Sequence, residues 1–281
     1  MGCGMDFAKT LRVKPGTKIG LDDFDPEWKP DSIDRNQAES LFAGLTRRLS
    51  DLQNVMYAEG TRSLLIVLQG RDAAGKDGTI RKVFGPVNPQ GCRVTSFKVP
   101  SKLEASHDFL WRCHLAAPAR GQMAIFNRSH YEDVLVVRVH DLVPKSQWSK
   151  RYNHINAFEK LLADNGTAIL KFYLHINREE QLARFKKRID NPKKNWKISD
   201  ADYSERPHWD TYTRAFEDAL SKCSTPHAPW FVVPANRKWL RNLIIADIVV
   251  RTMEEMKLAY PEPAVDMDAI RRMYHEAEES S

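Results

Sequence analysis

A short stretch, GRDAAGKD at residues 70–77, has the G-x-x-x-x-G-K spacing of a phosphate-binding loop. It follows the apolar run LLIVL and precedes a helical pattern, which is the context that this motif requires. Gly70 and Gly75 allow the backbone to curl so that several N–H groups face one anion, and Lys76 adds a full positive charge. A glycine-rich turn without a ligand is the alternative. The phosphate site that we predict comprises Gly70, Arg71, Ala73, Ala74, Gly75, Lys76, Asp77 and Gly78.

Two carboxylates are unexpected in a loop of this kind. Asp77 stands where an ordinary phosphate-binding loop has the hydroxyl that binds Mg²⁺, and in the first helical turn it can complement the helix dipole. Asp72 lies inside the loop, where a like charge at ~4 Å would cost on the order of 4 kcal/mol. Because Mg²⁺ is held by one or two carboxylates together with substrate phosphates, we predict that Asp72 anchors a metal. A turn residue that bonds its own backbone is the other interpretation.

Charged residues also follow the strand-like run MAIFN, in the sequence NRSHYEDV at 127–134. In P-loop kinases an acidic residue at this position usually closes the metal site. Here the position is Asn127, so its amide oxygen is a second, neutral candidate ligand. Arg128 follows it directly, and Glu132 and Asp133 lie within five residues of Arg128.

A strongly basic segment lies at 178–197, with eight Lys or Arg against three acidic residues. Arg184 and Arg188 are four residues apart and therefore share one helix face. A helix that breaks into a basic loop is typical of the flaps that cover phosphates in phosphoryl-transfer enzymes, although a solvated helix would look similar. We expect both arginines to be exposed and to act on phosphate, with little effect on stability.

The elements that must position these residues alternate along the chain. An amphipathic pattern of about seven helical turns begins at Asp34. Strand-like runs follow at 64–68, 92–97, 123–127, 168–176 and 230–235, with helices at 148–165 and 239–256. This alternation predicts an α/β fold with a parallel sheet covered on both faces, and ligands at the carboxyl ends of its strands. We divide the chain into a polar N-terminal arm (1–33), a catalytic domain (34–260) with a lid at about 178–210, and a C-terminal tail (261–281).

Composition limits the class of protein. The 281 residues carry a net charge of +6, and 42% of them are hydrophobic, which fits a folded domain with anionic partners. The four cysteines form no C-x-x-C pair, and no apolar run approaches the ~20 residues that span a membrane. We therefore expect a cytoplasmic protein without a membrane partner.

Four ordered segments resemble the P-loop polyphosphate kinases of family 2. They are GRDAAGKDGTIRKV, FNRSHYEDVLVVRVHDLVP, RIDNPKKNWKISDADYSERPHWDTY and APWFVVPANRKWLRN, and the resemblance extends from about Leu41 to Tyr260. It implies a three-layer fold like that of thymidylate kinase, with a helical lid. It also implies Mg²⁺-dependent transfer of a terminal phosphoryl group between inorganic polyphosphate and a nucleotide, with Mn²⁺ as a substitute. The segment NRSHYEDV resembles the class III branch, which uses AMP as well as ADP, although many family members have Asp in place of Asn127.

The resemblance assigns roles to the charged residues. Asp72, Lys76 and Arg128 are the expected catalytic residues, and Arg81, Arg184 and Arg188 would extend a basic tunnel for polyphosphate. Asn127, Glu132 and Asp133 are the expected nucleotide contacts. For Glu132 and Asp133 the reason is that carboxylates cannot face a polyphosphate channel without a cation. For the two acids, capping of a helix is the alternative. The expected partners are polyphosphate and AMP, ADP or ATP, with guanine nucleotides as further acceptors, in a homo-oligomer of two or four subunits.

Two other functions fit parts of the sequence. An ATP-dependent nucleoside monophosphate kinase shares the loop, lid and metal, but the residue after Lys76 is not a hydroxyl. A nucleic-acid-binding P-loop protein would suit the basic charge, but no basic strand interleaved with aromatic residues indicates an RNA module, and we expect no nucleic acid partner.

Overall fold

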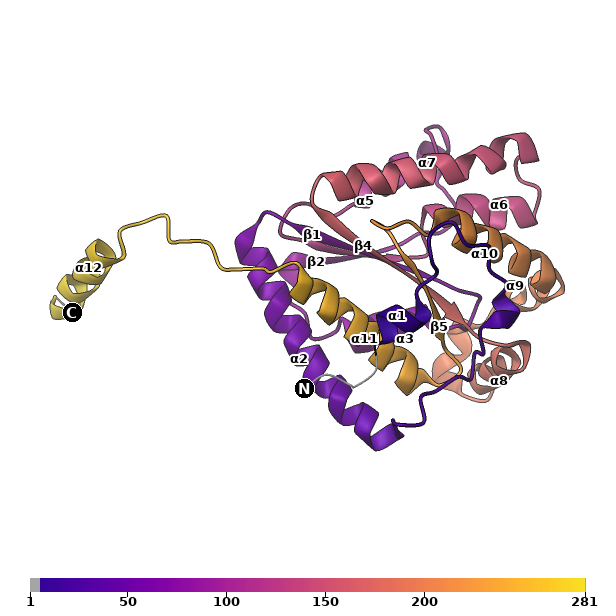
Figure 1. Ribbon diagram of the computed structural model, residues 1–281, viewed down its shortest axis with the longest axis horizontal. Helices are drawn as coiled ribbons and strands as arrows, with labels where there is room; N and C mark the ends of the chain where they lie inside the picture. The colour runs from indigo at the N-terminus through magenta and orange to yellow at the C-terminus, as the bar shows by residue number, and fades with distance from the viewer. Residues whose placement is uncertain (1–5, 281) are drawn as a thin grey trace.

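Five parallel strands form the central sheet of the protein, in the spatial order β2-β3-β1-β4-β5 (Figure 1). The computed structural model describes residues 6–280. The strands are β1 (Ser63–Gln69), β2 (Cys92–Ser96), β3 (Met123–Asn127), β4 (Thr167–His175) and β5 (Trp230–Pro234), at the five predicted places. In the register of β1 and β3, Leu68 pairs with Asn127. The phosphate-binding loop after β1 and the charged turn after β3 therefore lie side by side at the carboxyl ends of these neighbouring strands.

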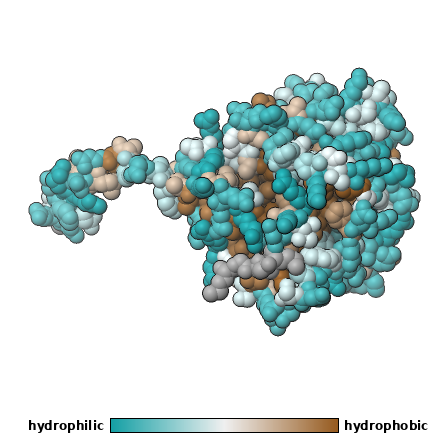
Figure 2. Space-filling view, in the orientation of Figure 1, coloured by the Kyte–Doolittle hydropathy of each residue, from teal (hydrophilic) through white to brown (hydrophobic). Residues whose placement is uncertain are grey.

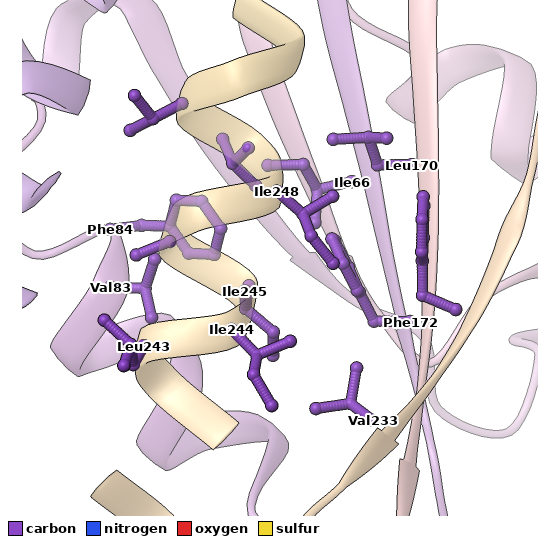
Figure 3. Close-up of a cluster of buried hydrophobic side chains, with 14 of the residues drawn as sticks. Ile66, Val83, Phe84, Leu170, Phe172, Val233, Leu243, Ile244, Ile245 and Ile248 are labelled. Carbon is purple, nitrogen blue, oxygen red and sulfur yellow. The ribbon is translucent and has the colours of Figure 1, made fainter. Parts of the chain in front are cut away.

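Helices cover both faces of this sheet. On one face, α2 (Arg35–Glu59), α3 (Lys76–Val83) and α11 (Lys238–Glu255) share a hydrophobic core with β1 and β4. Figure 3 shows this core, in which Ile244, Ile245 and Ile248 of α11 lie against Ile66 and Phe172 of the sheet. The other face is covered by α5 (Trp111–Ala116), α6 (Val136–Val139), α7 (Lys145–Asp164) and α10 (Trp209–Cys223). The α/β prediction is thereby confirmed.

Helix α2 has the beginning, length and buried stripe that its sequence predicts. The Asp34 carboxylate accepts a hydrogen bond from the backbone N–H of Gln37 at 2.8 Å, and the Gln37 side chain accepts one from the N–H of Asp34. Gly60 ends the helix with φ of +65°, a conformation that favours glycine. Leu49, Leu52 and Met56 are buried against α11. Helix α2 therefore packs on the same face of the sheet as α11, opposite to the face covered by α7.

The predicted lid consists of short helical pieces after β4. They are α8 (Arg178–Ile189), the 3₁₀ turn η4 (Pro192–Lys197), α9 (Asp200–Ser204) and the 3₁₀ turn η5 (Arg206–His208), which leads into α10. The remaining short elements are α1 (Phe7–Leu11), η1 (Leu21–Asp23), η2 (Pro89–Gly91), α4 (Lys102–Ala105) and η3 (His130–Val134).

The N-terminal segment is more integrated than the predicted surface arm. Phe7, Leu11 and Val13 are buried, and the N–H of Val13 donates to the carbonyl of Trp230 at 2.9 Å. An isolated antiparallel bridge also joins Arg12 to Phe231. The segment from residue 6 onward thus covers the outer edge of β5, while residues 1–5 of the predicted arm lie outside the described residues.

The C-terminal tail forms one further helix, α12 (Met267–Glu279). It stands away from the main body at the end of an extended linker (Figures 1 and 2), and none of its residues is buried. Between residues 6 and 280, no helix is both long enough and apolar enough to cross a membrane.

Candidate functional site

The phosphate-binding loop curls between β1 and α3 at two glycines that cannot be replaced without strain. Gly70 has φ of +153°, and a Cβ there would lie 2.9 Å from the carbonyl oxygen of Leu174. Gly75 has φ of +108°, and a Cβ there would lie 2.0 Å from a guanidinium nitrogen of Arg241. The loop therefore owes its shape to close packing on β4 and on Arg241 as well as to backbone freedom.

Lys76 lies at the centre of the loop. Its ammonium donates to the carbonyl of Gly70 at 2.7 Å and to that of Arg71 at 3.3 Å. Burial, with a contribution from the nearby positive charge of Arg128, lowers the pKa of Lys76 to about 8. Lys76 also lines a large basic cavity.

Each of the two unexpected carboxylates has a partner at the carboxyl end of β3. Asp72 accepts a hydrogen bond from Arg128 at 2.7 Å, and Asp77 accepts one from the side-chain amide of Asn127 at 2.8 Å. Arg128 also lies 3.6 Å from a carboxylate oxygen of Glu132. The structure therefore brings together Asp72, Lys76 and Arg128, the three residues that the sequence predicts to be catalytic.

A wide cavity of about 720 Å³ opens on one side of the pair formed by Asp72 and Arg128. Its lining contains twelve Lys or Arg side chains against three Asp, and we call it the basic channel. Eight of the predicted phosphate contacts line this channel: Ala73, Gly75, Lys76, Asp77, Gly78, Arg81, Arg184 and Arg188. The sequence interpretation did not name seven further cationic residues of this lining: Lys82, Lys98, Lys187, Lys194, Lys197, Lys238 and Arg241.

A second cavity also includes Asp72 and Arg128 in its lining and differs in chemistry. Trp209, Tyr212, Phe216 and Leu135 line it together with Glu132, Glu205, Gln181, Arg71 and Arg206, and we call it the aromatic pocket. The guanidinium carbon of Arg71 lies 3.7 Å from the ring centroid of Trp209. Arg71 thus turns away from the channel, although it belongs to the predicted phosphate loop. A third, more open depression around Tyr152 and Lys222 contains none of the predicted site residues.

Comparison with known proteins identifies the family. The model of the polyphosphate kinase 2 family matches residues 32–261, which is most of the chain. The chain belongs to the polyphosphate kinase 2 family. The predicted resemblance is confirmed, and the transfer enzyme that it implied is favoured over a nucleic-acid-binding protein.

Full-length relatives of this polyphosphate kinase agree in both sequence and structure. An AMP/ADP-polyphosphate phosphotransferase from Meiothermus ruber is 49% identical over 263 residues, which cover 93% of this chain and 98% of that protein. An ADP-polyphosphate phosphotransferase from Rhodopseudomonas palustris is 45% identical, with 90% and 92% covered. The crystal structure of polyphosphate kinase 2 from Arthrobacter aurescens TC1 matches with a TM-score of 0.94 at 39% identity and covers 98% of this chain and 99% of that one.

Two expected site residues of the kinase have other surroundings than the sequence suggested. Asp133 is 9% exposed, accepts a hydrogen bond from Arg151 at 2.9 Å and lies 3.9 Å from Arg112. Burial raises the pKa of Asp133 to about 6, although both arginines oppose the shift. It lines neither the basic channel nor the aromatic pocket, and its partners in this structure are arginines.

Arg184 is the second correction. It is 5% exposed, and its guanidinium donates to the carbonyls of Ala73, Ala74, Ala235 and Asn236 at 2.5–3.1 Å. The expectation that both lid arginines are exposed is therefore wrong for Arg184. Its guanidinium joins the phosphate-binding loop to the segment after β5. Arg188 is more exposed, donates to the carbonyl of Lys197 and lies 3.5 Å from Asp202.

The donor set of the site fits a hard divalent cation. Among residues 6–280, no three His, Cys, Asp or Glu side chains gather into a cage made by protein alone. However, Asp72, Asp77 and Asn127 all line the basic channel at the place where Lys76 faces it. Magnesium keeps most of its ligands as water and substrate phosphate and needs only one or two carboxylates from the protein. Asp77 was not among the metal ligands expected from sequence, because its place in a helical first turn suggested a dipole contact instead.

Proposed function

We propose that this enzyme transfers the terminal phosphoryl group of inorganic polyphosphate to AMP and ADP, giving ADP and ATP. The observation that carries the proposal is the pair of unlike cavities that meet at Asp72 and Arg128. A channel with twelve cationic side chains suits an extended polyanion. The aromatic pocket is small in this structure, about 40 Å³, but its three aromatic rings offer the apolar surface on which a nucleobase stacks.

Both substrates then meet at the loop. An oxygen of the acceptor's terminal phosphate attacks the end phosphorus of the chain, a P–O bond to the nucleotide forms, and the P–O bond to the shortened polyphosphate breaks. The attacking group is already an anion, so no general base is required. Catalysis therefore consists of alignment and charge neutralisation, in which Lys76 and Arg128 neutralise the oxygens of the transferred group.

Mg²⁺, or Mn²⁺ in its place, would be held by Asp72 and Asp77, with Asn127 as a neutral neighbour. When bound, the cation would offset negative charge on the phosphates. The carboxylates could then face a polyanion without the repulsion that they would otherwise cause.

Glu132 distinguishes the nucleotide side of the site. It lines the aromatic pocket and does not line the basic channel, as expected for a carboxylate that accepts hydrogen bonds from ribose hydroxyls or an adenine amino group. We propose that AMP and ADP share this pocket, with the nucleoside one phosphate nearer to or further from a fixed transfer point. The name of the Meiothermus ruber relative includes both acceptors.

A time course with AMP as the sole acceptor tests the function. Polyphosphate, Mg²⁺ and an inhibitor of adenylate kinase are present, and we expect ADP first and ATP later. Brisk ATP formation from ADP without any product from AMP would leave a kinase specific for diphosphates. Parallel reactions with GMP and GDP measure base preference, and a reaction with ATP as the only donor to AMP tests the alternative kinase.

Two further properties belong to the proposal. We place the enzyme in the cytoplasm, because its cysteine pattern suits a reducing compartment. We also propose a homo-oligomer of two or four subunits, which sedimentation at several protein concentrations would test.

A further inference from the structure

Four polar side chains form a fully buried cluster beneath the turn that carries Arg128. They are His130, Tyr131, Glu159 and Lys171, and each is 0% exposed. The Lys171 ammonium donates to Glu159 at 2.5 Å and to the Tyr131 hydroxyl at 2.8 Å, while the Tyr131 hydroxyl lies 2.9 Å from Glu159. His130 lies 3.1 Å from the same carboxylate. We call these residues the buried polar cluster.

This cluster is costly in a hydrophobic layer. Removing a carboxylate and an ammonium from water costs several kcal/mol per ion, and apolar residues of similar volume often fill such a space as well or better. Burial would raise the pKa of Glu159, but the ammonium of Lys171 and the ring of His130 outweigh it and lower that pKa, which favours the carboxylate form of Glu159. None of the four side chains lines the basic channel or the aromatic pocket, so the cluster does not contact substrate.

The cluster is connected to Arg128 through the backbone of Ser129, because His130 and Tyr131 follow Ser129 directly. Tyr131 donates its N–H to the hydroxyl of the buried Ser129, which also accepts a hydrogen bond from Gln69 at 3.2 Å. Gln69 is the last residue of β1 before the phosphate-binding loop. The turn is thus fixed to the cluster on one side and to β1 on the other.

Arg128 itself has an unfavourable backbone conformation. Its φ is +62°, in the left-handed region that residues with a Cβ rarely adopt. Its N–H donates to the carbonyl of Leu68 at 3.1 Å, and its guanidinium contacts Asp72 at 2.7 Å. A strained residue of this kind persists only where its surroundings fix it from several sides.

We propose that the buried polar cluster is a positioning device for Arg128. Through Ser129 and the backbone of the turn, it holds Arg128 in the left-handed conformation that points the guanidinium at the junction of the two cavities. Tyr131, Glu159 and Lys171 are in this view positioning residues that act on phosphoryl transfer without touching a phosphate. The inference rests on the proposed role of Arg128 in transfer.

Tyr131→Phe is the sharpest test, because it removes one hydroxyl from the cluster and leaves the pair of Glu159 and Lys171 in place. If the turn loses its alignment, kcat should fall roughly tenfold or more while the KM values change little, since small misplacements of a catalytic group have effects of this size. The matched control is Thr167→Val. Thr167 lies on the same strand as Lys171, and its buried hydroxyl pairs with Ser63 at 2.9 Å at the far end of the sheet.

Both variants should lower the melting temperature, but only Tyr131→Phe should lower kcat. Equal loss of kcat in the two variants, or a normal kcat in Tyr131→Phe, would overturn the proposal. If Tyr131→Phe does not fold, His130→Leu removes the other contact between the turn and Glu159 and serves the same comparison.

A double-mutant cycle separates positioning of Arg128 from a general effect on the fold. In an Arg128→Lys background, which keeps the charge but loses the guanidinium, Tyr131→Phe should change kcat less than twofold, because residues that act through one another are not additive. The same tenfold loss in both backgrounds would overturn the inference but not the proposed function. A normal rate in Arg128→Lys alone would instead overturn the role of Arg128, and with it this inference.

Discussion

Arg184 and Arg188 lie one helical turn apart on α8, yet their environments predict opposite consequences of mutation. The guanidinium of Arg184 is enclosed and donates to carbonyls of the phosphate-binding loop and of the segment after β5, at Ala235 and Asn236. We expect Arg184→Ala to destabilise the fold, and Arg188→Ala to leave stability nearly unchanged and weaken polyphosphate use.

The size of the effect follows from the hydrogen bonds. Of the four carbonyls that Arg184 contacts, only that of Ala74 also receives a hydrogen bond from Arg241. Three carbonyls therefore lose a charged donor, and at about 1 kcal/mol each the loss is about 3 kcal/mol. For a chain of this length, about 3 kcal/mol corresponds to a decrease in melting temperature of about 5 °C. Arg188 makes one carbonyl contact and a longer ion pair with Asp202, so its removal should cost less than about 1 kcal/mol.

The assay is thermal unfolding of the two variants side by side, followed by steady-state kinetics at 25 °C. Arg184→Ala should show the lower melting temperature, and Arg188→Ala should show the higher KM for polyphosphate. Arg184→Lys is a useful third variant, because it keeps the charge without the fork that reaches several carbonyls. Melting temperatures within 1–2 °C of one another would refute the interpretation that Arg184 braces the loop.

Two further predictions concern the loop itself. The Lys76 ammonium must be charged to bind an anion, and its pKa of about 8 means that this charge is lost as the pH rises. Polyphosphate affinity measured by calorimetry should therefore fall roughly tenfold between pH 7 and 9, and Lys76→Ala should bind weakly with a much flatter profile. Asp72→Asn should lose roughly 10²–10³ in rate with the fold intact, because a charged contact at the transferring group is removed. Near-normal activity of Asp72→Asn with an unchanged Mg²⁺ requirement would contradict the metal assignment.

The parts of the fold that sequence predicted well are those in which one local pattern determines one environment. β1 is buried along its whole length, so its run of apolar residues could belong only to an element covered on both faces. Helix α2 carries its own capping signal at Asp34 and Gln37. The N-terminal segment was underestimated because Phe7, Leu11 and Val13 are isolated apolar residues in a polar context. Only their contact with β5 shows that they are buried.

The site was predicted only in part, because local sequence patterns do not specify contacts between distant segments. Spacing places Arg184 and Arg188 on one helix face, but it does not say which turn of that face packs on the loop. Glu132 and Asp133 are adjacent in sequence, yet one lines the aromatic pocket and the other pairs with Arg151. Trp209 reaches Arg71 from 138 residues away, and no local pattern encodes that contact.

The carboxylate of Asp72 inside the loop has a physical explanation. In this structure, the charge of Asp72 is balanced by Arg128 at 2.7 Å. A phosphate chain that takes Arg128 as its partner withdraws that balance, and Asp72 then faces like charge at a cost on the order of 4 kcal/mol at ~4 Å. A divalent cation restores the balance, so cation and polyphosphate should each strengthen the binding of the other by the same factor. Titration of Mn²⁺ in the presence and absence of polyphosphate measures this coupling. It should be large in the wild-type enzyme and greatly reduced in Asp72→Asn, and equal coupling in both would show that the carboxylate balances no charge at the transfer point.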